Sequence, residues 1–241
     1  MAQLQNITNL DGGNLIAFPR ADLRHLLGGA VKRHRLPEDL GQALVREAAN
    51  FANVSAHTAL SCALALRMSH EPIDFEKARG ILLVGPAGSG KSAVAAKIAH
   101  AAALIGRKVE LTRADGGLAL FRTRTNPPEL LTVMEADGFN PLNSRAASAF
   151  SALGDIGGVE TIGVISAMSD AEDVSDIVTA FHLRRVIITN MDRTRRLGAA
   201  LAAALSGARL AHVTYDPRPE DGLQVLEAGA LAAQMLEITS H

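Results

Sequence analysis

Eight consecutive residues form the pattern most able to do chemistry in this sequence. They fit G-x-x-x-x-G-K-[ST], a loop whose backbone N–H groups cradle a di- or triphosphate. In order, the eight are Gly85, Pro86, Ala87, Gly88, Ser89, Gly90, Lys91 and Ser92. The Lys91 ammonium would hold the β- and γ-phosphates, and the Ser92 hydroxyl would take a place on Mg²⁺. The pattern therefore predicts a nucleotide-binding loop.

Residues of opposite structural preference flank this loop. Residues 81–84 are all apolar, which is typical of a strand buried on both faces of a parallel sheet. Residues 93–99 are rich in alanine and favour a helix, whose positive N-terminal end would face the phosphates. A glycine turn could match the pattern by chance, but the strand before it and the helix after it favour the phosphate loop.

The composition narrows the class of protein. The chain has 241 residues, 48% of them hydrophobic, which suffices for one large α/β domain with a smaller appendage. It has no Trp, one Tyr and a formal net charge of −1, so we expect no direct DNA binding. The single cysteine, Cys62, excludes an internal disulfide and suits the reducing cytosol. No apolar stretch approaches the ~20 residues that span a bilayer, so we expect a cytoplasmic protein.

The sequence divides into three parts. Residues 1–19 are polar and predict a flexible tail. Residues 20–75 carry apolar residues at helical spacing and predict a helical domain of three or four helices, and residues 76–241 predict the domain with the phosphate loop. The basic run Lys32-Arg33-His34-Arg35 could meet an acidic partner or a membrane surface, although a solvated charged turn is more common.

Strands and helices alternate in the third part. We expect strands at 81–84, 108–112, 130–134, 161–166, 185–189 and 210–214, and helices at 93–99, 143–153, 171–181, 195–205 and 221–236. This alternation predicts an α/β fold with a doubly wound, mostly parallel sheet. In such sheets the loops at the carboxyl ends of the strands form the functional site.

Acidic residues follow several of the expected strands. Asp115 follows the second strand and is either a catalytic group or an ordinary turn residue before two glycines. Glu135 and Asp137 follow the third, where they are either a simple acidic turn or part of a metal shell. Asp192 follows the fifth strand.

Two features occur together in this order: a helical segment precedes the phosphate loop, and the segment ITNMDRTRRLG at 188–198 follows a late buried strand. That layout resembles the signal-recognition-particle type GTPases, and among them most the flagellar GTPase FlhF. The resemblance covers about residues 22–237. It implies an NG-type architecture, in which a helical N domain precedes a P-loop G domain that binds GTP and GDP with Mg²⁺.

The resemblance also implies roles for single residues. Thr189, Asn190 and Asp192 would lie in the segment that reads guanine, with the Asp192 carboxylate accepting from the base. Asp115 matches an aspartate that orients water and the metal shell. Glu135 would reach the Mg²⁺ shell together with Ser92, and Gly138 would offer an N–H to the γ-phosphate.

The sequence also departs from the family pattern. Gly116 and Leu118 replace a Thr and an Arg of the family's D-T-x-R motif, so the transition-state charge stabilisation by that arginine is missing. Asn190 replaces a Lys that packs on the base. Since phosphoryl transfer depends on positioning and charge neutralisation, we expect GTP binding with slow or partner-stimulated hydrolysis.

The resemblance implies a switch in protein targeting or flagellar placement. Such a switch pairs with a second copy or with another GTPase-type protein, and it could meet a peripheral membrane or flagellar basal-body partner at the inner face of the cell membrane. The alternatives are a degenerate module that binds nucleotide without hydrolysis, and an ATP-specific P-loop ATPase. A small-molecule kinase, with Arg122 and Arg124 in a lid, is less favoured because so long a helical segment before the loop is unusual there.

Overall fold

The computed structural model describes residues 19–51, 53–115, 117, 121, 127–138 and 157–237. Residues 1–18 of the predicted tail and the predicted helix at 143–153 lie outside them. The chain forms two compact units, one of Met1–Arg67 with Glu227–His241 and the other of Met68–Leu226. Among the described residues, none of the helices has the length and apolar character needed to cross a bilayer.

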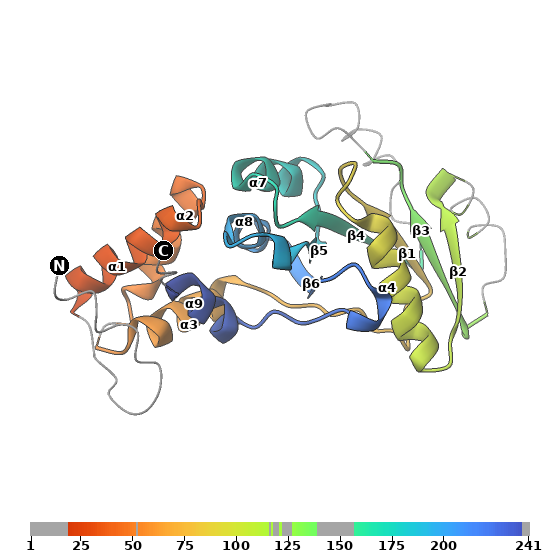
Figure 1. Ribbon diagram of the computed structural model, residues 1–241, viewed down its shortest axis with the longest axis horizontal. Helices are drawn as coiled ribbons and strands as arrows, with labels where there is room; N and C mark the ends of the chain where they lie inside the picture. The colour runs from red at the N-terminus through yellow and green to blue at the C-terminus, as the bar shows by residue number, and fades with distance from the viewer. Residues whose placement is uncertain are drawn as a thin grey trace. The chain divides into compact units, whose positions relative to one another are not determined.

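The first unit is helical (Figure 1). Its elements are α1 (Arg20–Arg33), α2 (Glu38–Ala48), α3 (Ala56–Arg67) and α9 (Ala228–Leu236). Pro37 precedes α2. The acidic residues Glu38 and Asp39 lie in the first turn, where their negative charges interact favourably with the positive end of the helix and stabilise it. Buried leucines from all four of these helices form its interior, including Leu23, Leu44, Leu60 and Leu231.

The C-terminal helix belongs to this helical unit. Leu231, Ala232 and Met235 of α9 are buried, and α9 packs on α3. The Met235 carbonyl at its end accepts a hydrogen bond from Arg33 Nη2 at 2.8 Å and lies 3.1 Å from His34 Nε2. This division differs from the expected one, which placed residues 76–241 together, because the apolar face of α9 is covered by α3 and α1, about 170 and 200 residues earlier.

The second unit contains a six-stranded sheet in the order β2-β3-β1-β4-β5-β6, and all the strand pairs are parallel. The strands are β1 (Gly80–Val84), β2 (Lys108–Arg113), β3 (Leu130–Glu135), β4 (Val159–Ser166), β5 (Arg185–Thr189) and β6 (Arg209–Val213). Among the described residues, the helices between them are α4 (Lys91–Leu104), α7 (Ala171–Ala180) and α8 (Gly198–Leu205), with 3₁₀ turns η2 (Met191–Arg193) and η3 (Pro219–Asp221). The predicted doubly wound parallel sheet is confirmed.

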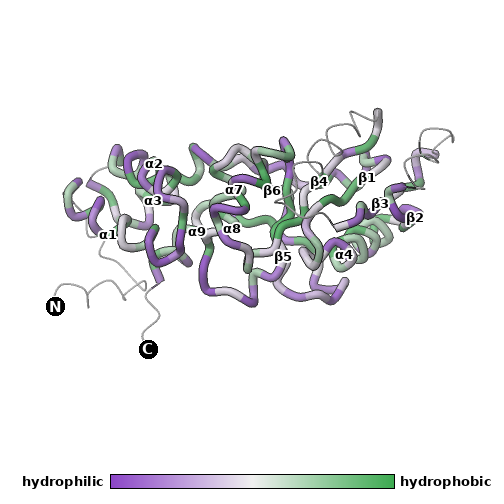
Figure 2. Tube along the Cα trace, turned by 90° about the horizontal axis from the view of Figure 1, so that it is seen from above, coloured by the Kyte–Doolittle hydropathy of each residue, from purple (hydrophilic) through white to green (hydrophobic). Residues whose placement is uncertain are grey.

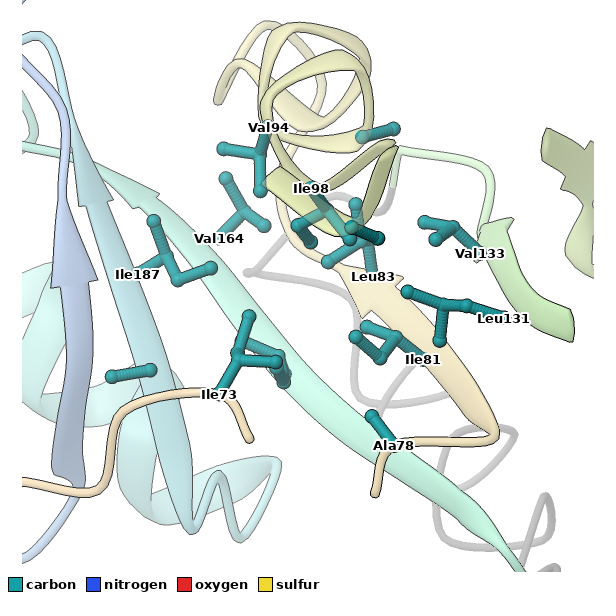
Figure 3. Packing of buried hydrophobic residues seen from close by; sticks show 14 residues of the cluster. Ile73, Ala78, Ile81, Leu83, Val94, Ile98, Leu131, Val133, Val164 and Ile187 are labelled. Carbon is teal, nitrogen blue, oxygen red and sulfur yellow. The ribbon is translucent and has the colours of Figure 1, made fainter. Parts of the chain in front are cut away.

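The core of this unit lies between α4 and the sheet. Val94 and Ile98 of α4 point toward Leu83 of β1 and Val164 of β4, and all four side chains are fully buried (Figure 3). Figure 2 shows hydrophobic residues along β1 and β5, which are buried at every position. Since β1 lies between β3 and β4, with the chain crossing to either side of it, the loop after β1 lies at a topological switch point.

The segment that leads into β1 also packs on the sheet. Arg185 donates to the carbonyls of Glu71 and Pro72, at 2.6 and 2.8 Å, and pairs with Glu160 at 2.5 Å. Ile73 is part of the core cluster. Residues 68–75, expected in the helical domain, are therefore part of the sheet unit.

The expected helix at 221–236 is shorter in the structure. Gly222 has φ of +67°, which ends the η3 turn, and Gln224 pairs with Val213 in an antiparallel bridge. These contacts hold residues 222–224 in an extended path along β6, so α9 begins only at Ala228.

Candidate functional site

The loop between β1 and α4 depends on its glycines. Gly88 and Gly90 have φ of +76° and +94°, a left-handed conformation that favours glycine. A Cβ on Gly85 would lie 2.2 Å from the Val164 carbonyl oxygen, so β4 leaves no room for a side chain there. Gly90 at the start of α4 has no side chain to cap that helix, so the first N–H groups of α4 remain for an anion or water.

Lys91 lies inside the curve of this loop. Its Nζ donates to the carbonyl oxygens of Gly85 and Pro86, both at 2.9 Å. Burial lowers the pKa of the ammonium, and the negative charge of Glu135 partly opposes this shift. The charge is therefore held at the loop, close to the path a phosphate chain would follow.

Ser92 of the helix α4 contacts Glu135 of the strand β3. Ser92 Oγ, in the first turn of α4, donates to Glu135 Oε2 at the end of β3 over 2.7 Å. Mg²⁺ in nucleotide sites takes one or two protein oxygens and completes its shell with phosphates and waters. The Ser92 hydroxyl and the Glu135 carboxylate are oxygen ligands of the kind that Mg²⁺ takes. Among the described residues there is no cluster of three or more His, Cys, Asp or Glu that could hold a metal ion.

The turn after β3 touches the phosphate loop. A Cβ on Gly138 would lie 2.7 Å from Ala87 Cα and 2.8 Å from Ala87 N, so the two backbones are in contact there. Asp137, one residue earlier, forms an ion pair with Arg113 at the end of β2. The structure thus brings Gly138 and Glu135, two of the predicted catalytic residues, to the loop.

Thr189 contacts the loop from the other side. Its Oγ1 donates to the Ser89 carbonyl at 2.7 Å, and the Thr189 side chain is buried. The Asn190 amide donates to Ser166 Oγ at 3.1 Å and to Thr189 Oγ1 at 3.2 Å. In this structure both residues make contacts within the protein: Thr189 fixes the loop, and Asn190 joins the ends of β4 and β5.

The two remaining predicted residues, Asp115 and Asp192, are exposed. Asp115 lies in a helical turn directly after β2, and Asp192 lies in η2 after β5. The backbone N–H of Met191 donates to the Thr214 carbonyl at 3.0 Å, so η2 is fixed beside the end of β6. Arg122 and Arg124, considered for a kinase lid, lie outside the described residues.

Sequence reasoning missed two contacts in this region. Arg113 follows the expected strand at 108–112 and received no role from the sequence, although its place two residues before Asp115 was a signal. Lys97, on α4, is buried and donates to the Arg218 carbonyl, which joins the helix behind the phosphate loop to the segment after β6. A lysine within an apolar helical run was the signal there.

The fold matches solved structures although no family model and no curated protein sequence matches the chain. A crystal structure of FlhF complexed with GMPPNP and Mg²⁺ has a TM-score of 0.69 at 15% identity, covering 90% of this chain and 100% of that one. FtsY from Mycoplasma mycoides has a TM-score of 0.67 at 14% identity, with 96% and 93% covered. FtsY from Thermotoga maritima has a TM-score of 0.66 at 15% identity, with 97% and 93% covered. The expected NG-type P-loop fold is therefore confirmed.

Proposed function

We propose that this chain, which has the fold of FlhF and FtsY, binds GTP and GDP with Mg²⁺ and hydrolyses GTP slowly or on contact with a partner. The 2.7 Å contact between Ser92 and Glu135, at the end of the glycine loop that holds Lys91, carries this proposal. This contact supports a Mg²⁺ site in which the hydroxyl and the carboxylate would hold the metal ion beside the β- and γ-phosphates.

Two observations favour guanine over adenine as the base. Asp192 follows β5 on the η2 turn, and its carboxylate would accept from N1–H and the exocyclic amine of guanine. The FlhF structures with a similar fold are complexes with GMPPNP or GTP and Mg²⁺. The Asn190 amide, which donates to Ser166 and Thr189, would hold the η2 turn rather than pack on the base.

The proposed role is a switch in protein targeting or flagellar placement. In this role the nucleotide state would control pairing with a second copy or with a GTPase-type partner, at a peripheral membrane or basal-body site. A second candidate is a module that binds nucleotide without hydrolysis. It is favoured by Leu118, which replaces the arginine of the family motif.

Competition between GTP and ATP, together with turnover, tests the proposal. The unaltered chain should prefer GTP, and Asp192→Asn should lose most of that preference while it still binds the phosphates. Turnover is then measured with and without membranes or partner extract, and the native mass with GTP and with GDP. A preference for ATP would contradict the guanine assignment, and zero turnover under every condition would favour the non-hydrolysing module.

A further inference from the structure

Arg113 stands at the last paired position of β2, beside the proposed metal ligand. In the register of the sheet Arg113 is the partner of Glu135, whose carboxylate accepts from Ser92 Oγ at 2.7 Å. Its guanidinium forms an ion pair with Asp137, two residues further along the turn after β3. Arg113 is therefore anchored to the same turn that touches the phosphate loop through Gly138.

The ion pair between Arg113 and Asp137 is weak enough for another anion to displace Asp137. The side chains of Arg113 and Asp137 are 72% and 82% exposed, and ion pairs that exposed contribute little to stability. A terminal phosphate carries more charge than a carboxylate and offers several oxygens to the planar guanidinium, so it forms the stronger charge-assisted pair. An anion of that kind beside the turn would compete with Asp137 for Arg113.

The turns around Arg113 are rich in negative charge. Asp115, Glu135 and Asp137 are carboxylates at the ends of β2 and β3 or directly after them, and among the described residues at 113–115, 117 and 135–138 Arg113 is the one cation. These carboxylates would repel a triphosphate bound at the loop, where Lys91 supplies positive charge from the loop itself. The transfer of a phosphoryl group requires added positive charge on the γ-phosphate oxygens.

We propose that Arg113 is a catalytic residue that acts in cis: it leaves Asp137 when GTP binds and pairs with the γ-phosphate. This inference rests on the proposed function and names the group that replaces the arginine absent at Leu118. In the reaction, a water oxygen forms a bond to the γ-phosphorus while the bond to the β–γ bridging oxygen breaks. The electron pair of that bond stays on GDP, and the water protons pass to the released phosphate and to solvent. Arg113 neutralises charge on the equatorial oxygens as this happens.

The full chain with Arg113→Ala tests this, with titration of Mg²⁺–GDP and Mg²⁺–GMPPNP and with single-turnover hydrolysis of GTP. GDP affinity should stay within about twofold, GMPPNP affinity should fall about fivefold or more, and the rate constant should fall about 100-fold or more. Arg113→Lys keeps the charge without the planar fork, and it should recover only part of the rate. The matched control is Arg209→Ala, which removes another exposed, ion-paired arginine at the opposite end of the sheet and should change none of the three values.

The variant Asp137→Asn distinguishes a catalytic role of Arg113 from a role of the ion pair in holding the turn after β3. It breaks the same ion pair but leaves the arginine in place, so the GMPPNP to GDP preference and the hydrolysis rate should persist. If Asp137→Asn loses as much as Arg113→Ala, the pair only shapes the turn, and the proposal is overturned. Unchanged GMPPNP affinity and rate in Arg113→Ala would also overturn it. If the unaltered chain shows no turnover, the test is the ratio of the affinities for GMPPNP and GDP. An unchanged ratio in Arg113→Ala would then overturn the proposal. Those results leave nucleotide binding intact, whereas an unaltered chain that binds no nucleotide overturns the proposed function itself.

Discussion

Thr189 Oγ1 donates a hydrogen bond of 2.7 Å to the carbonyl oxygen of Ser89, one hundred residues earlier in the chain. A buried hydroxyl at the end of β5 therefore fixes the backbone of the phosphate loop. The family resemblance implies base recognition for the segment that contains Thr189, but the contact that Thr189 makes is to the loop that would hold the phosphates.

Thr189→Val should weaken GTP and ATP binding by a similar factor. Valine keeps the shape of the side chain but leaves the Ser89 carbonyl without its donor. The lost hydrogen bond costs about 1–3 kcal/mol, and if the loop shifts we expect nucleotide affinity to fall by roughly tenfold or more. Titration with both nucleotides measures this. Thr179→Val is the control, since that hydroxyl donates to the Ser175 carbonyl of its own helix at an exposed position. A change in base preference without a loss of affinity would contradict the assignment.

Glu135→Gln should raise the Mg²⁺ concentration needed for tight nucleotide binding by about tenfold. The amide removes the negative charge but can still accept from Ser92 Oγ, so the loop should keep its shape. The measurement is GDP affinity over a series of Mg²⁺ concentrations, including EDTA. Glu129→Gln, an exposed acid just before β3, is the matched control. An identical Mg²⁺ dependence in Glu135→Gln and the unaltered chain would exclude Glu135 from the metal shell.

Gly138→Ala should weaken nucleotide binding by about 1–3 kcal/mol, because the added Cβ would lie within 2.9 Å of three atoms of Ala87. The loop would have to move away from the turn. Gly157→Ala is a sensitive comparison: a Cβ there meets nothing within 4 Å, so both affinity and melting temperature should stay unchanged. Equal nucleotide affinities of Gly138→Ala and Gly157→Ala would show that the contact between Gly138 and Ala87 does not support the loop.

The sheet unit should lose stability in acid through His212. This imidazole is buried, accepts from the Ile73 N–H at 3.1 Å and stacks on Phe75. Burial, helped by the positive charge of Arg185, lowers the pKa of His212 from 6.5 to about 4. Because the folded state binds the proton less well than the unfolded state, the contribution is complete above pH 6.5 and is lost as the pH falls toward 4.

The shift corresponds to about 3 kcal/mol of unfolding free energy across that range. Denaturant unfolding of the unaltered chain at pH 7.5 and pH 5 should show most of this loss. His212→Gln keeps an acceptor for Ile73 but does not titrate, so its stability should vary less with pH. The exposed His25→Gln is the control, and some acid sensitivity should persist in all variants because burial also lowers the pKa of His34. An equal pH dependence in His212→Gln and the unaltered chain would contradict this account.

The sequence predicted the parts of this protein whose signals are local. Apolar runs such as 81–84 and the glycine pattern at 85–92 are properties of neighbouring residues, and the buried strand β1 and the loop after it follow from them. The place of Glu135 beside Ser92 also followed, because the carboxyl ends of parallel strands share one edge of the sheet.

What the sequence did not reveal depends on contacts between distant segments. The helix α9 could have covered either unit, and its place was decided by buried side chains such as Leu231 and by the polar groups of Arg33 and His34 at its end. The loop contact of Thr189 and the ion pair of Arg113 likewise join residues whose separation gives no pattern in the sequence.

Titration of the purified chain with GTP and GDP in Mg²⁺, beside Lys91→Ala, tests the central claim most directly. The unaltered chain should bind both, and loss of the buried ammonium that donates to Gly85 and Pro86 should weaken binding by about 100-fold. Lys108→Ala, which removes an exposed lysine at the start of β2, should bind as the unaltered chain does. Equal affinity in Lys91→Ala and the unaltered chain, or no binding of any purine nucleotide, would contradict a phosphate site at this loop.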